Sequence, residues 1–513
     1  MPLPRASGAA VKVAGPRTLD VRTDALVTSV LAYLGLPVLL LAVYLHTLAG
    51  AAAAVLLVTA LVSAASARHS PDRSETPRGV ISLRWGEVAL IVVLALVLAF
   101  LGGAVGVVDP PWDWNKHNAL LHDLTTMSWP VTYEGAGNAS LVYSFGLYLP
   151  AAAAAKAAGG SVLIAHAALL VWIALGYALV LMLISGFFPQ GRRALTAAVA
   201  LVVFGGADVL GSVVASGSAV PTEWWFPSNG VFVQYSGNVS ALVWVPQHAI
   251  PSWFIGAMFV RAWPSKRWRE GRGLLFAVGL SALWSPFAAI GGAVLLGALL
   301  LRFAVQRVPL RWRSLWVEVC LGLALIPVAL FLSLIGGGQE LSTSGIGPRG
   351  YVFFLAVEIG LWVVMACFAG HYRSALVPVL LVLLVLPLLR IGEFNDLAMR
   401  ASLPSLMALN VLAWVGVLRG TAWPNRLIGR IALTVVGVAA VALSAPTGFL
   451  EIQRVVAGQP PPAYEQFWDE SVPAFLERLD SSPSIWAQYL TCPRGLAARV
   501  LGLAECRGAD AVR

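Results

Sequence analysis

Apolar runs of about the length of a membrane span recur along nearly all of this 513-residue chain. A helix rises 1.5 Å per residue, so roughly 20 apolar residues cross the roughly 30 Å hydrocarbon core of a bilayer. A helix also satisfies its own backbone hydrogen bonds in that environment. Hydrophobic residues make up 58% of the chain and charged residues 12%, which excludes a soluble globular protein. The sequence therefore predicts an all-α, multi-pass membrane protein.

We expect about thirteen membrane-spanning helices on the ~20-residue criterion. The stretch 141–158 is interpreted as interfacial or re-entrant, because a full crossing would put Arg192, Arg193 and every later basic cluster on the wrong side. The segment 273–301 is basic at both ends, which favours a hairpin of two short helices. The expected spans are 25–45, 48–66, 87–108, 161–187, 194–213, 241–260, two within 273–301, 315–335, 351–369, 374–391, 401–418 and 431–448.

The formal net charge of +9 is assigned to membrane topology. Arg and Lys lie in short clusters between apolar runs, as the positive-inside bias requires, so no nucleic-acid partner is expected. The N-terminus is then cytoplasmic and the C-terminus outside, and an Ala-rich composition favours a bacterial plasma membrane. The segments expected to share the outer side are 109–160, 216–240, 336–350, 393–400 and the tail from 449.

The chain divides into a membrane domain, 1–448, and a small polar outer tail, 449–513. The tail is too short to be a catalytic domain with a large core of its own. Cys492 and Cys506 lie in this tail, where an oxidising environment would allow them to pair. The four cysteines of the chain show no metal-binding spacing.

The stretch Asp109 to Glu134, DPPWDWNKHNALLHDLTTMSWPVTYE, concentrates ionisable residues beside an apolar span. Two prolines stop the incoming helix. If the stretch is helical, one face carries Asp113, Lys116, His117, Leu120 and Asp123. This arrangement indicates a site on the membrane surface. The alternative is an interfacial helix with solvated charges and an aromatic belt of tryptophans.

Further polar residues are expected on the same side. Asp208 interrupts an apolar span, where a carboxylate is costly and indicates function, although a structural hydrogen bond to a neighbouring helix is the alternative. Asp396 and Arg400 are four residues apart, so a simple ion pair accounts for them equally well. The remaining candidates are Glu223, Trp224, Gln247 and His248. Gln247 and His248 lie in an expected span that prolines distort.

This layout resembles the GT-C class of integral membrane glycosyltransferases. The resemblance rests on a first outer loop of acidic and aromatic residues, Asp109 to Glu134, then a Tyr- and Gly-containing amphipathic stretch, LVYSFGLYLPAAAAAKAAGG, many short spans and acidic outer loops. It implies a polyprenyl-phosphate-linked sugar donor, a glycan or lipid acceptor, contact with membrane lipids, and an essential acid in the first outer loop.

In this interpretation Asp113 is the general base, with Asp109 and Asp123 as the next candidates. Lys116, His117, His248 and Arg400 are candidates for stabilising the departing phosphate, and a divalent cation, Mg²⁺ or Mn²⁺, is left open.

Two other classes stay open: a polymerase or ligase of lipid-linked glycans, and a transporter or flippase that uses Asp208. The chain has neither a phosphate-binding Gly-rich loop nor a Gly-x-Ser-x-Gly elbow, which argues against ATP-driven transport and serine hydrolysis.

Overall fold

Helices provide nearly all of the regular structure, as the apolar runs predict. The computed structural model describes residues 18–69, 79–104, 112–217, 223, 231–310, 315–336, 340–392, 394–420, 427–458, 469–479 and 481–503. The α-helices are α1 (Thr23–Leu45), α2 (Leu48–His69), α3 (Trp85–Leu101), α4 (Asp113–Thr126), α5 (Leu149–Ala157), α6 (Val162–Ser185), α7 (Arg193–Val203), α8 (Asp208–Ser216), α9 (Asn238–Trp244), α10 (Pro246–Ala262), α11 (Trp268–Ser281), α12 (Pro286–Val305), α13 (Trp316–Ala324), α14 (Ile326–Leu332), α15 (Pro348–Leu355), α16 (Leu361–Ala366), α17 (Leu376–Val385), α18 (Asp396–Ala401), α19 (Leu403–Gly420), α20 (Leu427–Ala457), α22 (Val472–Arg478), α23 (Pro483–Trp486) and α24 (Gly495–Leu501).

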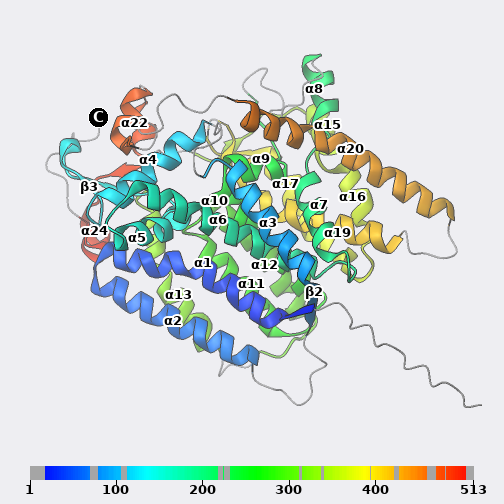
Figure 1. Cartoon of the computed structure of the whole chain (residues 1–513), viewed down its shortest axis with the longest axis horizontal. Helices are drawn as coiled ribbons and strands as arrows, with labels where there is room; N and C mark the ends of the chain where they lie inside the picture. Colours follow the sequence, from blue (N-terminus) through cyan, green and yellow to red (C-terminus); the bar gives the residue numbers. More distant parts are fainter. Residues whose placement is uncertain are drawn as a thin grey trace, which may run out of the picture.

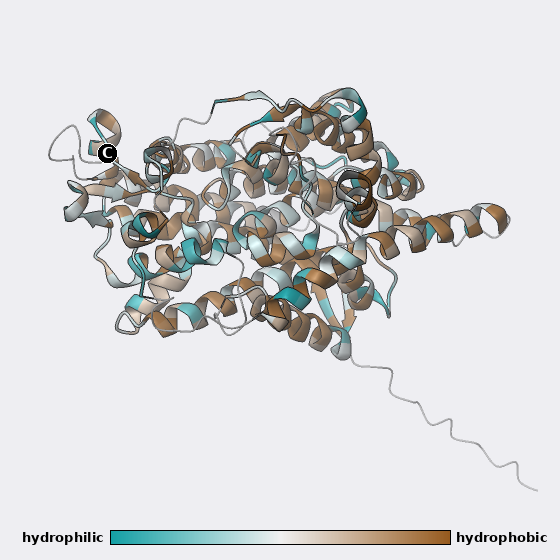
Figure 2. Ribbon diagram, turned by 90° about the horizontal axis from the view of Figure 1, so that it is seen from above, coloured by the Kyte–Doolittle hydropathy of each residue, from teal (hydrophilic) through white to brown (hydrophobic). Residues whose placement is uncertain are grey.

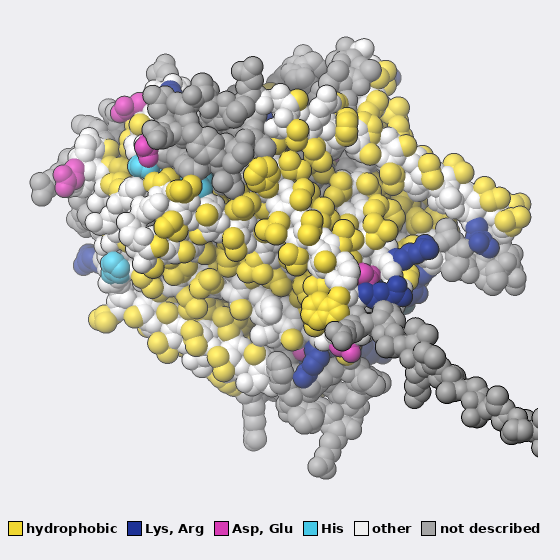
Figure 3. Space-filling view, viewed as in Figure 1, with side chains coloured by type: hydrophobic (Ala, Val, Ile, Leu, Met, Phe, Trp, Pro, Cys, Tyr) yellow, Lys and Arg dark blue, Asp and Glu magenta, His cyan; other side chains and the backbone are white. Residues whose placement is uncertain are grey.

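Within the described ranges, nine helical segments are long and apolar enough to cross a membrane. They support a multi-pass, helical membrane protein. On the face shown in Figure 3, apolar side chains cover a broad central area. Figure 2 shows that apolar residues also dominate most of the long helices when the molecule is seen from above.

The expected count of thirteen spans exceeds these nine because four expected segments are short or interrupted. α3 has 17 residues and α11 has 14. A break at Val245 separates α9 from α10, and a break at Leu325, just before Pro327, separates α13 from α14. Proline removes a backbone donor and its ring crowds the preceding turn, so it starts a new helix in both places.

One expected segment agrees with the structure, and one expected boundary changes. α5 has 9 residues and is about 14 Å long, too short to cross a bilayer, in agreement with an interfacial or re-entrant stretch. α20 continues to Ala457 with Pro446 inside it, rather than ending at 448. The tail that was expected from 449 therefore starts nine residues, about two and a half turns, later.

Short strands bring loops together at one end of the molecule. β1 (Thr18–Arg22) and β2 (Val80–Arg84) pair antiparallel, and Arg193 donates to the Ser82 carbonyl oxygen at 3.4 Å. The segment before α1 and the segment before α3 therefore lie side by side (Figure 1). Figure 3 shows that most Lys and Arg side chains in view gather towards the end that carries β2.

The segments expected on the outer side meet one another at other strands. β4 (Ala139–Leu141) lies between β3 (Thr132–Tyr133) and β7 (Leu490–Thr491), so the first loop and the tail share one sheet. The amide of Gly336 donates to the Ala487 carbonyl oxygen at 2.8 Å. β5 (Ser342–Thr343) pairs with β6 (Leu389–Arg390). In Figure 1 the first loop, α22 and α24 lie at the same side of the molecule.

Closely packed helices at the centre hold α10 and α12 against the segment 401–404, where α18 ends and α19 begins. A Cβ at Gly256 of α10 would lie 2.4 Å from the Pro404 carbonyl oxygen, and one at Gly291 of α12 would lie 2.0 Å from that of Ala401. Small residues of this kind let helix backbones approach closely inside a membrane. This packing holds His248 and Arg400, which α10 and α18 carry, in one region of the core.

Candidate functional site

Asp113 and Lys116 form an ion pair at the start of α4. Their Oδ2 and Nζ atoms are 3.4 Å apart, and the two side chains are 20% and 10% exposed, respectively. Burial alone would raise the pKa of Asp113, but Lys116 and Arg400 outweigh burial and hold this pKa below its usual value. Asp113 is therefore a carboxylate at neutral pH. Although burial opposes it, the Asp113 charge raises the pKa of Lys116.

His117 points into the protein from the same helix and is neutral. Its Nδ1 bonds the Tyr148 hydroxyl, and its Nε2 lies 3.3 Å from the Trp244 carbonyl oxygen. Because a carbonyl only accepts, Nε2 carries the proton and Nδ1 accepts from Tyr148. Burial, reinforced by the Lys116 charge, lowers the pKa of His117 to about 3. His117 therefore carries no positive charge at neutral pH.

Arg400 supplies the second positive charge of the site. Its guanidinium lies 3.1 Å from the Asp396 carboxylate, so the expected ion pair is confirmed. Arg400 also acts electrostatically on Asp113, which the ion pair alone did not predict. Tyr143 and Tyr489 stack beside this group, with ring centroids 5.2 Å apart. Tyr489 comes from the tail, and no local sequence signal places it here.

His248 and Gln247 extend the site at the start of α10. The Nδ1 of His248 lies 2.6 Å from the Ser285 hydroxyl, and the charges of Arg400 and Lys116 reach this ring. Among the described residues, the His248 Nε2 atom and both polar atoms of the Gln247 amide have no hydrogen-bond partner. Buried polar atoms normally have partners, so these atoms indicate where water or a ligand binds.

Asp123 is fully buried and has a different environment from Asp113. Its carboxylate accepts from the Tyr133 hydroxyl at 2.5 Å, contacts His122 at 2.9 Å and accepts from the Val472 amide at 2.8 Å. These three contacts tie α4 to the first loop and to the tail. The geometry therefore favours a structural role for Asp123.

Asp208 and Glu223 belong to a second buried cluster. The Asp208 Oδ2 atom accepts from the Thr447 hydroxyl at 2.8 Å, and Asp208 is 1% exposed. Burial, with the nearby Asp208, raises the pKa of Glu223 to about 8. Glu358 is 2% exposed, and its carboxylate lies beside Asp208 around Gly206.

Glu358 was missed by the sequence analysis, although the rule that selected Asp208 applies to it. It is an isolated carboxylate in an apolar span, within the π-helical turn Ala356–Gly360. Such turns are frequent at functional sites.

Asp109 and Trp224 lie outside the described residues. In the part of the chain that the structure describes, no three His, Cys, Asp or Glu side chains are grouped so that they could hold a metal ion. Cys492 forms a disulfide, and its expected partner, Cys506, also lies outside the described residues.

Apart from Asp123, the described candidates form two groups. Asp113, Lys116, His117, His248, Gln247, Asp396 and Arg400 lie in one region, and Asp208 and Glu223 form the core of another. Comparison with protein-family models, with curated proteins and with solved structures found no match to this chain.

Proposed function

We propose that this chain is a membrane glycosyltransferase that transfers a sugar from a polyprenyl-phosphate-linked donor to an acceptor on the outer face. One observation carries the proposal: an ionised carboxylate, Asp113, lies among the cations Lys116 and Arg400. The charges of both cations also reach His248, whose Nε2 has no hydrogen-bond partner among the described residues. This reaction needs a carboxylate that takes the proton of the acceptor hydroxyl and cations that stabilise the departing phosphate.

In the proposed reaction, an acceptor hydroxyl oxygen attacks the anomeric carbon of the sugar. Asp113 takes the hydroxyl proton, and the bond between the anomeric carbon and the phosphate oxygen breaks. The electron pair leaves with the lipid phosphate, whose charge Lys116 and Arg400 stabilise. His248 adds a hydrogen bond through Nε2, while neutral His117 holds α4 against Tyr148 and the Trp244 carbonyl.

The proposed topology has thirteen membrane spans, with the N-terminus in the cytoplasm and the first loop and tail outside the plasma membrane. It is supported by the contacts among the segments 139–141, 336 and 487–491 and by the basic residues near β1 and β2. The polyprenyl chain would then lie in the outer leaflet with its phosphate at the level of α4.

The decisive experiment incubates the purified chain in lipid nanodiscs with radiolabelled polyprenyl-phosphate sugars and with glycan and lipid acceptors, and it measures release of lipid phosphate. Wild-type protein should release lipid phosphate from at least one donor, and Asp113→Asn should release it about two to four orders of magnitude more slowly. Absence of release and of transfer from hexose, pentose and amino-sugar donors would reject the proposal.

A proton-coupled transporter is a second candidate, because the cluster of Asp208, Glu223 and Glu358 is buried among apolar helices. A carboxyl whose pKa is near 8, such as that of Glu223, exchanges protons close to neutral pH. Substrate-dependent proton uptake into proteoliposomes that Asp208→Asn abolishes and Asp113→Asn leaves intact would favour this function over transfer.

A further inference from the structure

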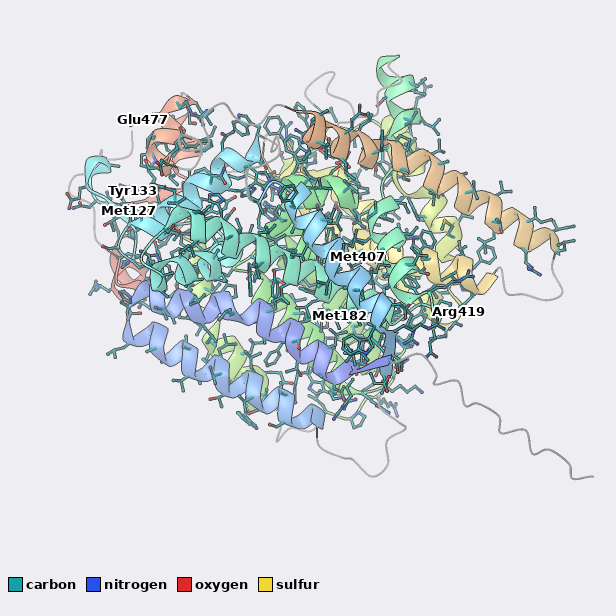
Figure 4. All side chains as sticks on the ribbon, in the orientation of Figure 1. Met127, Tyr133, Met182, Met407, Arg419 and Glu477 are labelled. Carbon is teal, nitrogen blue, oxygen red and sulfur yellow. The ribbon has the colours of Figure 1, made fainter. Side chains whose placement is uncertain are left out.

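A groove lies at the end of α4 opposite to Asp113. The C-terminal end of α4, the strand β3 and the turn Glu134–Ala136 form one wall, and the helices α22 and α23 of the tail form the other. Its volume is about 940 Å³, within the range of known ligand sites. Figure 4 shows Met127 and Tyr133 on the first wall and Glu477 on the helix that faces them.

The two walls are held together by contacts that do not need a ligand. Asp123 accepts from Tyr133 on one wall and from the Val472 amide at the start of α22 on the other. The pairing of β4 with β7 fixes the tail from its far side. The groove is therefore already formed in the free protein, so a ligand does not have to order the tail when it binds.

The chemistry of the lining favours a neutral carbohydrate. Glu134 and Glu477, both exposed, lie on opposite walls and are the charged side chains among its described residues. Two carboxylates repel a phosphate, so the groove is unsuited to the anionic end of a lipid donor. Carboxylates and the hydroxyl of Ser128 accept hydrogen bonds from sugar hydroxyls, and the ring of Trp486 offers a flat apolar surface to a sugar face.

The position of the groove relates it to the site around Asp113. α4 has 14 residues and is about 21 Å long, with Asp113 at its first turn and the groove at its last. A ligand must therefore span about that length to occupy the groove while its end reaches Asp113. A single monosaccharide cannot do both.

We propose that this groove binds a neutral oligosaccharide, which is the acceptor that the site around Asp113 extends. The identity of the acceptor rests on the proposed transferase function, whereas the binding itself does not. Trp486 and Tyr133 provide apolar surfaces, and Glu134 and Glu477 bind hydroxyl groups from either side.

The test measures binding to the full chain in lipid nanodiscs by calorimetry and saturation-transfer NMR, without any donor. The probes are neutral linear hexasaccharides of glucose, mannose, galactose and arabinose, with a sulfated hexasaccharide and hexalysine as charged probes. We expect at least one neutral probe to bind and the sulfated probe not to bind. Trp486→Ala should weaken that binding about tenfold.

Two further variants guard against loss of folding at Trp486, which also packs against the core. Ser128→Trp fills the groove from the other wall without removing a packed side chain, and it should weaken binding at least as much. Trp85→Ala removes a tryptophan that is 56% exposed and lies outside the groove, and it should leave binding unchanged.

Binding of none of the four neutral probes would overturn the proposal. The proposal would also be overturned if hexalysine bound more tightly than every neutral probe and lost that affinity in Glu477→Gln. The groove would then be a site for a cationic peptide. If groove variants lose binding while wild-type protein shows no transfer with any donor, the binding site stands and the transferase function fails.

Discussion

Replacing Asp113 by Asn tests the central assignment most directly. The change keeps the shape of the side chain and removes the group that accepts the proton. We expect turnover to fall by about two to four orders of magnitude, the usual contribution of a general base. The binding of donor should change far less, because Lys116 and Arg400 remain in place.

The same substitution also removes the partner of Lys116, whose Nζ lies 3.4 Å from Asp113. A lost hydrogen bond to a charged group costs about 1.5–3 kcal/mol, and the 20% exposure of Asp113 puts the expected loss at the lower end. The variant should therefore insert and fold normally. Thermal unfolding in the nanodisc, recorded beside the rate, separates lost chemistry from lost structure.

The assay is single-turnover release of lipid phosphate from the labelled donor, measured from neutral to acidic pH. Because the folded pKa of Asp113 is lowered, its base form is present at neutral pH and is lost only as pH falls through a value below 3.8. Wild-type activity should therefore show no acidic limb from Asp113 in the neutral range.

Asp123→Asn is the matched control, since it lies on the same helix. Turnover of Asp113→Asn within about tenfold of wild type, in folded protein, would refute the reasoning. Greater loss in Asp123→Asn than in Asp113→Asn would move the base to the other end of α4.

Three further outcomes follow from the structure. Burial and the nearby Asp208 raise the pKa of Glu223 from 4.5 to about 8. The stability that Glu223 contributes is therefore full below about pH 4.5 and is lost as pH rises through about 8. The melting temperature should drop between about pH 5 and about pH 9, and Glu223→Gln should reduce that drop. Asp123→Asn weakens the contact with the Val472 amide and should lower the free energy of unfolding by about 1–3 kcal/mol. Hydrogen exchange in α22 should then increase. Unchanged exchange in α22 would contradict the structural role of Asp123. The topology can be tested in a chain in which Cys320→Ser and Cys367→Ser remove the free cysteines. In that chain, Gly135→Cys should react with an impermeant maleimide in intact cells, whereas Lys266→Cys should react only after permeabilisation. The reverse result would show that the proposed topology is inverted.

Hydropathy located most of the helices, because each span must hide its backbone within its own length. It was less reliable where proline acts. Pro327 starts a new helix in the expected span 315–335, whereas Pro446 lies inside α20 without ending it. The effect of a proline depends on whether neighbouring groups satisfy the carbonyl that it leaves free, and this is a tertiary property.

The helical spacing of Asp113, Lys116 and His117 correctly placed them together on α4. Their protonation could not be obtained from spacing, since the neutral state of His117 follows from complete burial against Tyr148 and Trp244. The same periodicity put Asp123 on this face, but its contacts with Val472 and Tyr133 depend on where the tail lies.

The contact between Asp123 and Val472 joins residues 349 positions apart, which has a consequence for how the protein is made. Chains grow at about 5–20 residues per second, so α4 waits roughly 17 to 70 seconds for the tail that completes its surroundings. During that interval the carboxylate of Asp123 has no amide from the tail, and Tyr489 is not yet beside Arg400. The newly inserted helices thus precede a finished site, which is complete only when the tail has docked against α4.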